Sequence, residues 1–397
     1  MEQLFYRYNP WWENKNFHHQ SIERPLLIEK TENVVNQSLI AVISGLRRIG
    51  KTTLMKQIIY KLITQKQIEQ KYIFFVSLDN YLLKDQSLLA IVEEYFKIHG
   101  LSYSEKVYLF FDEITYKEDY EVQLKNLIDS YHVQIVISSS SSSMLRNRKA
   151  HLTGRTSTVE ILPLDFEEYL QFKNIKIKTS GSHLFEKYFM DFLVTGGIPA
   201  FVLNNQIEFI QNLVDDIIYK DIAVLHHINK TQVLKDYFLL LMERSGKQLS
   251  INKIATILKI SPDTSSRYLE LFAETFLISM VTRYGKTNEQ VLAPKKIYAA
   301  DLGIRCFFTG ARDFGSLFEN YVFLKLKHLN PKYVYQDSTE IDFLTESKLM
   351  IEVKFHNESL SEKQQKLFDN FEKCKQKTIV RNFNDLNKPK LFIGNKV

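Results

Sequence analysis

Short apolar runs alternate with amphipathic stretches between Gln37 and about Leu164. An apolar run bounded by helical sequence is typical of a parallel strand that is buried on both faces. The alternation therefore predicts an α/β fold, with a parallel sheet in residues 36–165 and an N-terminal arm in residues 1–35. The predicted strands are Leu39–Ser44, Tyr72–Ser77, Val107–Phe111, Val133–Ser138 and Val159–Leu162.

The hydrophobic pattern changes after this segment. It is helical over residues 166–243, which we interpret as a helical lid, and over 244–300 it predicts two short helices and a hairpin. From residue 301 to 397, a helix precedes three strands and a polar helix near Ser361–Lys375, which predicts a smaller α/β domain. Its strands are Lys332–Tyr335, Glu340–Leu344 and Leu349–Phe355.

The composition excludes a disordered or fibrous chain. The 397 residues include only 13 glycines and 8 prolines, and 28 phenylalanines and 21 tyrosines can build a large core. Two cysteines cannot form a disulfide framework. The chain also starts without a signal-peptide pattern and has no apolar run of about 18 residues. We therefore expect a soluble, cytoplasmic protein that does not bind a membrane.

Most of the net charge of +6 lies in one segment. Between Arg244 and Arg305 there are ten Lys or Arg residues and five Asp or Glu residues. A locally basic segment favours contact with nucleic acid, so DNA is an expected partner. An ordinary solvated surface has the same composition, and this alternative stays open.

The most specific motif lies between the first predicted strand and a helix predicted over Thr52–Ile63. Residues 45–53, Gly-Leu-Arg-Arg-Ile-Gly-Lys-Thr-Thr, match the phosphate-binding loop G-x-x-x-x-G-K-[ST]. Lys51 would contact the β- and γ-phosphates, and the Thr52 hydroxyl would ligate Mg²⁺. The sequence therefore predicts ATP and Mg²⁺ as cofactors. The expected nucleotide contacts are Gly45, Arg47, Arg48, Gly50, Lys51, Thr52 and Thr53.

A strand that ends in two acids supplies the catalytic partner of this loop. Asp112 and Glu113 follow the apolar run Val107–Phe111. Asp112 would reach Mg²⁺ through water, and Glu113 would polarise the attacking water as a general base. The adjacent glutamate distinguishes ATPases with an extra strand between the two motifs, and we assign Tyr72–Ser77 to that extra strand.

Two further features are candidates for the same site. The strand Val133–Ser138 runs into six serines, of which Ser140 or Ser141 would sense the γ-phosphate, although an ordinary loop has the same composition. Arg155 would act as an arginine finger in the site of a neighbouring subunit, which implies a homo-oligomer. A surface arginine is an equal alternative.

Together these motifs resemble one large family. The chain is similar to the bacterial and archaeal AAA-type P-loop ATPases that carry a restriction-endonuclease-like C-terminal domain (domain of unknown function 4143). The resemblance implies an ATPase that converts ATP and water to ADP and phosphate. One position departs from the family, because Ser139 stands where glycine is usual. Besides the two nucleotide motifs, the matching segments are Tyr8–Glu13, 152–155, Leu162–Leu164, Gly196–Pro199 and the C-terminal Glu-x-Asp and Glu-x-Lys.

Residues 249–269 have the pattern of a helix-turn-helix, which predicts a winged-helix domain over 244–300. Ser250 is an N-cap for an apolar periodic stretch, and Pro262 suits the first turn of the second helix. Such helices dock in the major groove of DNA, but in ATPases they also serve as a lid or a protein contact. The residues expected to face DNA are Thr264, Ser266 and Arg267, with a basic wing over Arg283–Lys296.

The C-terminal strands carry a second set of charged residues. Alternation places Asp342, Glu352 and Lys354 together on one face, and Glu319 on the preceding helix, Ser316–Lys327, would complete the cluster. Two carboxylates can hold Mg²⁺, and a lysine can orient or deprotonate water for phosphodiester attack. The pattern resembles the D…ExK core of restriction-endonuclease-like folds. A hairpin with ordinary polar faces and an inactive nuclease fold are the alternatives. The opposite, buried faces are assigned to Ile341, Phe343, Ile351, Val353 and Phe355.

Two hypotheses for function follow. In the first, the chain is an ATP-hydrolysing AAA-type protein that acts on DNA and has a metal-dependent nuclease centre in residues 301–397. In the second, it is a nucleotide-controlled switch or scaffold whose inert C-terminal domain recruits a protein partner. Both hypotheses retain ATP hydrolysis.

Overall fold

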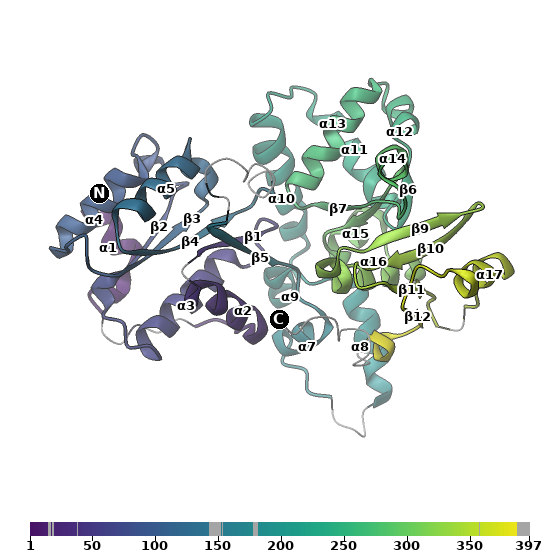
Figure 1. Cartoon of the computed structure of the whole chain (residues 1–397), viewed down its shortest axis with the longest axis horizontal. Coiled ribbons are helices and arrows are strands. Elements are labelled where there is room, and N and C mark those ends of the chain that lie inside the picture. Colours follow the sequence, from purple (N-terminus) through teal and green to yellow (C-terminus); the bar gives the residue numbers. More distant parts are fainter. Residues whose placement is uncertain are drawn as a thin grey trace. The chain divides into compact units, whose positions relative to one another are not determined.

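The chain divides into two units, Met1–Leu162 and Pro163–Val397. Figure 1 draws the computed structural model, which describes residues 1–386 except 15, 16, 18, 19, 38, 143–151, 153, 178–181 and 357. The boundary between the units lies three residues before the predicted end of the ATPase core. The finer division of the second unit into a lid, a winged helix and a nuclease-like domain stays a prediction.

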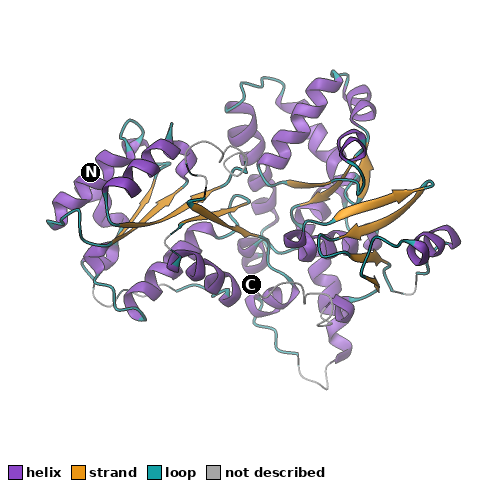
Figure 2. Ribbon diagram, in the orientation of Figure 1, coloured by secondary structure: helices purple, strands orange, loops and turns teal. Residues whose placement is uncertain are grey.

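A five-stranded parallel sheet forms the centre of the first unit, with the strand order β2-β3-β4-β1-β5. Helices cover both faces of this sheet (Figure 2), which explains the continuous apolar runs and confirms the α/β prediction. The strands are β1 (Ile40–Gly45), β2 (Ile73–Ser77), β3 (Val107–Asp112), β4 (Val133–Ser139) and β5 (Thr156–Ile161). The helices are α1 (Glu2–Tyr8), α2 (Pro25–Asn36), α3 (Lys51–Thr64), α4 (Leu88–His99) and α5 (Tyr120–Ser130).

The extra strand between the two nucleotide motifs is β4 rather than β2. β4 pairs with β1 on one side and with β3 on the other, whereas β2 lies at the sheet edge beyond β3. The assignment of Tyr72–Ser77 to the inserted position was therefore wrong. Order along the chain does not fix order in a parallel sheet, because each helical crossover can skip a strand position.

The predicted N-terminal arm packs on the edge strand β2 of its own sheet. The Asn9 side chain donates to the Phe75 carbonyl at 2.9 Å and accepts from the Phe75 N–H at 2.7 Å. The indole N–H groups of Trp11 and Trp12 both donate to the Ile73 carbonyl, at 3.2 and 3.0 Å. The arm thereby satisfies backbone groups that an open sheet edge would leave exposed.

The second unit begins with helices and continues into a three-stranded antiparallel sheet with the order β6-β8-β7. The first helices are α7 (Phe166–Phe172), α8 (Ser182–Thr195), α9 (Pro199–Asn204), α10 (Ile207–Asp216), the π-helix η6 (Ile217–Val224) and α11 (Thr231–Glu243). The sheet and its helices are β6 (Lys247–Leu249), α12 (Ile251–Leu258), α13 (Pro262–Glu274), β7 (Ile278–Val281), α14 (Thr287–Leu292) and β8 (Lys295–Ala299).

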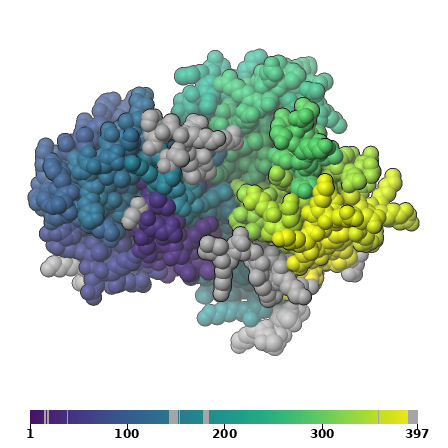
Figure 3. All heavy atoms as spheres, viewed as in Figure 1, coloured from purple at the N-terminus to yellow at the C-terminus, as the bar shows by residue number. Residues whose placement is uncertain are grey.

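The two short helices and the hairpin predicted within 244–300 are confirmed as α12, α13 and β7–β8. Ser250 accepts from the Lys253 N–H at 3.3 Å and Ser261 from the Thr264 N–H at 3.1 Å, so each helix has a serine N-cap. The prediction of a basic wing over Arg283–Lys296 was wrong at both ends of that segment. Arg283 donates to the Tyr335 carbonyl at 2.6 Å, and the Lys296 side chain is 1% exposed. Figure 3 shows this part of the chain in green.

A four-stranded sheet with the order β12-β11-β10-β9 follows. Its last strand was not predicted, because its first residues, Gln-Lys-Thr, are polar and at least partly exposed. The polar helix ends at Asn370 rather than near Lys375. The elements are α15 (Leu302–Thr309), α16 (Phe314–Leu326), β9 (Lys332–Gln336), β10 (Thr339–Leu344), β11 (Leu349–Val353), α17 (Glu362–Asn370), β12 (Gln376–Val380) and α18 (Phe383–Leu386).

Both faces of this sheet are covered, which sequence alternation did not predict. Ile341 packs in a cluster with Met350 and Phe368, whereas Phe343 packs in another cluster with Ile351. The common face assigned to Ile341 and Phe343 was therefore wrong. The register between β10 and β9 shifts between Ile341 and Leu344, and such an irregularity interrupts the alternation of faces.

Within the described residues, no helix combines the length and apolar character that a membrane span requires. Both cysteines, Cys306 and Cys374, are free thiols.

Candidate nucleotide site and C-terminal carboxylate cluster

The glycine-rich loop connects the carboxyl end of β1 to the first residue of α3, as the motif requires. Gly45 has a φ of 150° and Gly50 a φ of 103°, and a Cβ on Gly45 would lie 2.6 Å from the Ile161 carbonyl oxygen. These two positions therefore need glycine. The loop brings backbone N–H groups and the positive end of the helix α3 dipole to one place, which suits an anionic phosphate.

Lys51 lies folded over this loop. Its Nζ donates to the carbonyls of Gly45 at 3.2 Å and Leu46 at 3.1 Å, and it lies 3.8 Å from Glu113 Oε1. The side chain is 4% exposed. Two neutral carbonyls hold the ammonium loosely enough for phosphate oxygens to replace them.

Thr52 and Asp112 meet although 60 residues separate them. Thr52 Oγ1 donates to Asp112 Oδ2 at 2.6 Å. A hydroxyl and a carboxylate side by side at the start of α3 are the hard oxygen ligands that Mg²⁺ prefers. The residues therefore fit the predicted metal, which would neutralise the charge on the phosphates.

Ser138 is a member of this site that the sequence prediction missed. Its hydroxyl donates to Asp112 Oδ1 and accepts from the Glu113 N–H at 2.9 Å. It is the first serine after the apolar run of β4, the strand next to β3, so its position in the sheet was the signal that could have identified it. Ser138 fixes the orientation of Asp112 relative to Glu113.

Of the two candidate sensors, Ser140 contacts Glu113, the predicted general base. Its hydroxyl donates to Glu113 Oε2 at 3.0 Å. The Ser141 N–H instead donates to Ser139 Oγ at 3.0 Å, and Ser139 Oγ donates to the Ser141 carbonyl. Ser139 has no positive φ, so this position does not need the glycine that is usual in the resembling family. Ser143 and Thr153 lie outside the described residues.

The structure does not bring Arg155 to the phosphate loop of its own chain. Thr156, the next residue, pairs with Ile40 at the start of β1, whereas Gly45 lies at the other end of that strand. Arg155 Nη1 instead pairs with Asp129 at 2.7 Å, with both side chains more than 40% exposed. The remaining loop residues predicted to contact nucleotide, Arg47, Arg48 and Thr53, lie in or directly after the loop, with Arg48 exposed.

In the second unit, a buried lysine occupies the centre of the carboxylate cluster. Lys296, on β8, lies 2.7 Å from Glu319 on α16 and 2.6 and 3.0 Å from Glu340 and Asp342 on β10. Tyr298, two residues along β8, donates its hydroxyl to Glu319 at 2.6 Å. The sequence prediction included Glu319 and Asp342 but missed Lys296, Tyr298 and Glu340. Glu340 precedes Asp342 by two positions, so the period of a strand could have identified it.

Glu352 and Lys354 lie in the same cluster, as predicted. Lys354 Nζ and the amide of Gln364, on α17, approach Glu352 Oε1 at 3.0 and 2.9 Å. Glu352 Oε2 accepts from the Asp342 N–H at 3.2 Å, and Asp342 Oδ2 accepts from the Val353 N–H at 2.9 Å. The sequence prediction missed Gln364.

Burial and crowding of the acids raise their proton affinity. Burial and the nearby Asp342 charge raise the pKa of Glu319 to about 7 and that of Glu352 to about 8, although the neighbouring lysines oppose both shifts. Within the residues that the structure describes, no group of three or more His, Cys, Asp or Glu side chains is arranged to hold a metal ion. The ammonium of Lys296 lies between Glu319 and Asp342, two of the residues predicted for the nuclease-like centre.

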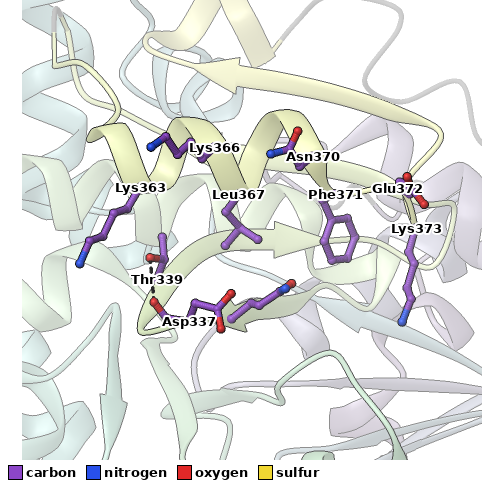
Figure 4. Close-up of a pocket in the computed structure, with 10 residues that line it drawn as sticks. Asp337, Thr339, Lys363, Lys366, Leu367, Asn370, Phe371, Glu372 and Lys373 are labelled. Atoms are coloured by element: carbon purple, nitrogen blue, oxygen red, sulfur yellow. Dashed lines mark hydrogen bonds between the residues drawn. The ribbon is translucent and has the colours of Figure 1, made fainter.

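A groove of about 730 Å³ lies beside α17 (Figure 4). Leu367 and Phe371 point from the α17 side toward the β9–β10 hairpin, where Thr339 bonds to the Asp337 carbonyl. Three lysines and two acids line the groove, so its charge balance is close to neutral and assigns no ligand by itself. The charged lining residues are Lys363, Lys366, Lys373, Asp337 and Glu372.

Comparison with known protein sequences places this chain in a family. An uncharacterized protein of Methanocaldococcus jannaschii is 30% identical over 374 residues, which cover 87% of this chain and 83% of that protein. The chain belongs to the family of that protein. Residues 37–170 match the family described as AAA domain, and residues 186–314 match a domain of unknown function (DUF8612). The AAA domain contains every residue of the nucleotide site.

Other members and similar structures add context. An uncharacterized protein of Haemophilus influenzae is 29% identical, covering 81% of this chain and 83% of that protein. Among solved structures, AMPPCP-bound DnaA from Aquifex aeolicus is 15% identical with a TM-score of 0.28, covering 67% of this chain and 92% of that one. A DNA polymerase III gamma subunit-related protein from Thermotoga maritima is 12% identical, with a TM-score of 0.28 and coverages of 63% and 98%. Such low TM-scores carry no argument about function.

Proposed function

We propose that the first unit of this AAA-domain protein binds Mg²⁺ and ATP and hydrolyses ATP to ADP and phosphate. The observation that carries the proposal is the 2.6 Å contact between Thr52 and Asp112, beside Lys51 and Glu113. Thr52 and Asp112 are the residues that would hold one Mg²⁺, which would neutralise negative charge on the phosphates. Lys51 would leave the loop carbonyls for the phosphates, and Glu113, oriented by Ser140, would accept a proton from the attacking water.

Two substitutions separate nucleotide binding from hydrolysis. Lys51→Ala removes the phosphate-binding cation, so binding of a fluorescent ATP analogue should weaken and phosphate release should stop. Glu113→Gln keeps the shape of the side chain but removes the base, so ATP should bind while phosphate release falls at least about 100-fold. Lys97→Ala, at an exposed position on α4, is the matched control and should change neither. Normal turnover by Glu113→Gln would refute the assignment of the base.

We also propose that the second unit contacts DNA through α12 and α13, the two helices of a winged-helix arrangement that also contains the β7–β8 hairpin. Ser266 and Arg267 are exposed on α13, Thr264 is half-buried, and Ser265 is buried, where its carbonyl accepts from Tyr237 at 2.7 Å. The surplus of five positive charges between Arg244 and Arg305 supports a basic surface here, although Arg283, Lys296 and the buried Arg305 do not belong to it.

A salt titration of DNA binding tests this surface. If Arg267 and Lys253 contact phosphates, each change to alanine should weaken binding and reduce the slope of log K against log salt by about one. Lys187→Ala, exposed on α8, should leave the slope unchanged. Equal binding by all these variants would place any DNA contact elsewhere.

For residues 301–397 we propose a restriction-endonuclease-like fold with an inert centre. The order of α16, the three antiparallel strands β9–β11, α17 and the parallel strand β12 supports the fold. The ammonium of Lys296 inside the carboxylates favours the scaffold hypothesis over cleavage. Plasmid DNA incubated with the protein and Mg²⁺ or Mn²⁺ should therefore stay intact. Nicking that Lys354→Ala abolishes would restore the nuclease hypothesis.

A further inference from the structure

Lys296 belongs to the three-stranded sheet, but its side chain lies among residues of the four-stranded sheet and α16. Its Nζ is within 3.0 Å of one oxygen from each of three carboxylates, those of Glu319, Glu340 and Asp342. The side chain is 1% exposed. A buried charge is tolerated only when opposite charges and hydrogen bonds compensate for its lost hydration.

The charges around Lys296 keep it protonated. Burial by itself lowers the pKa of this lysine, but Glu319 and the other anionic groups outweigh that effect and hold the pKa well above its ordinary value. A positive charge is therefore a permanent part of the cluster.

Every carboxylate oxygen of the two acids in the D…ExK pattern accepts at least one hydrogen bond in this arrangement. Asp342 accepts from Lys296 on one oxygen and from the Val353 N–H on the other. Glu352 accepts from Lys354 and Gln364 on one oxygen and from the Asp342 N–H on the other. A divalent cation placed between Asp342 and Glu352 would also meet the ammonium of Lys296, which repels it.

We propose that Lys296 is the resident cation of the C-terminal carboxylate cluster, and that its ammonium takes the place a divalent metal would need. The wild-type cluster then binds no divalent cation, and loss of the lysine charge converts the cluster into a metal site. The inference rests on the proposed nuclease-like fold of residues 301–397, but it requires neither ATP hydrolysis nor DNA cleavage.

Binding of Mn²⁺ to the full-length protein, followed by electron paramagnetic resonance without nucleotide, tests the proposal directly. Wild type and Asp342→Asn should retain equal amounts of Mn²⁺, because Asp342 holds no metal while Lys296 is present. Because these samples differ only at residue 342, any Mn²⁺ bound at the phosphate loop contributes equally to both, and a difference reports the C-terminal cluster alone. Mn²⁺ bound by wild type and lost in Asp342→Asn would overturn the proposal, and this arm does not depend on whether a lysine variant folds.

Substitution of the lysine supplies the second arm. Lys296→Met keeps the length of the side chain and removes its charge, so Mn²⁺ should raise the unfolding temperature of this variant by about 4 °C or more. Lys296→Met with Asp342→Asn should lose that effect, and Lys295→Met, at the neighbouring position, should behave like wild type. A folded Lys296→Met variant that gains no Mn²⁺ would also overturn the proposal. Failure of either arm leaves ATP hydrolysis by the first unit untouched, because no readout involves it.

Discussion

Both units of this chain place a buried lysine beside acids, but the two lysines are held differently. Lys51 bonds to two backbone carbonyls and lies 3.8 Å from one carboxylate, whereas Lys296 contacts three carboxylates within 3.0 Å. Neutral acceptors release an ammonium to a stronger anion, such as phosphate, at small cost. Three buried carboxylates do not release an ammonium in this way, because each would lose its positively charged partner. On our proposals, the same residue type binds a ligand in the first unit and excludes one in the second.

The largest expected contrast comes from the same substitution at both lysines. Lys51→Met should reduce ATP turnover by about 100-fold or more and change stability less, because the Lys51 ammonium bonds to two neutral carbonyls and lies 3.8 Å from Glu113. Lys296→Met should leave turnover unchanged and lower the free energy of unfolding by about 3–5 kcal/mol, because it leaves buried carboxylates uncompensated. Phosphate release and urea unfolding of the two variants measure both effects. Similar losses of stability would remove the distinction between the lysines.

The proposed oxygen ligands of the nucleotide site, Thr52 and Asp112, give a second contrast. Thr52→Val removes the hydroxyl that donates to Asp112 and keeps the shape of the side chain. The Mg²⁺ concentration needed for half-maximal ATP turnover should rise about tenfold or more, as one metal ligand is lost. Thr64→Val, at an exposed position at the end of α3, is the control. An unchanged Mg²⁺ requirement in Thr52→Val would show that the hydroxyl is not a ligand.

Asp301 is a further buried acid, and its contribution to stability should depend on pH. Burial raises the pKa of Asp301 from 3.8 to about 6, although the N–H groups of Gly197 and Ile304 donate to it and oppose the shift. The folded state then holds this proton at pH values where the unfolded chain has lost it, so the contribution of Asp301 to stability falls as pH rises from about 4 to 6.

The free energy of unfolding of wild type minus that of Asp301→Asn should therefore decrease by up to about 3 kcal/mol between pH 4 and pH 7. Urea unfolding at several pH values measures this difference, and pH effects shared by both proteins cancel. A difference that stays constant or increases with pH would contradict the assignment.

The smallest effect is expected at the exposed ion pair. Arg155→Ala removes a contact to Asp129 in which both partners are largely solvated, so stability should change by less than about 1 kcal/mol. ATP turnover in dilute solution should stay within twofold of wild type, because Arg155 does not reach the loop of its own chain. A loss of turnover that appears only at concentrations where the protein self-associates would support the arginine-finger hypothesis.

Local motifs were the part of the site that could be predicted from sequence. The nine-residue loop, the Asp112–Glu113 pair and the two serine-capped helices depend on contacts within a few residues, and the structure contains each of them. Glycine positions were also informative. A Cβ on Gly197 would lie 2.2 Å from the Leu164 carbonyl, and one on Gly303 would lie 2.0 Å from the Thr195 carbonyl.

Long-range pairing between strands could not be predicted from the sequence. The amino-acid order does not show that β4 separates β1 from β3, because parallel strands are joined by crossovers of variable reach. The wing prediction failed for a related reason, since a charged residue on a hairpin has the same sequence signature whether it faces water or another sheet. Arg283 and Lys296 both face the four-stranded sheet.

The sequence by itself determined that this chain has a phosphate-binding loop, an acidic partner strand and a D…ExK pattern, because each is a short run with a fixed spacing. Only the tertiary structure decided what those acids meet. Asp112 meets the hydroxyls of Thr52 and Ser138, whereas Asp342 meets the ammonium of Lys296, 46 residues away. Whether a carboxylate is available to a metal ion depends on the nearest opposite charge, and in a buried site that charge is placed by packing between distant elements.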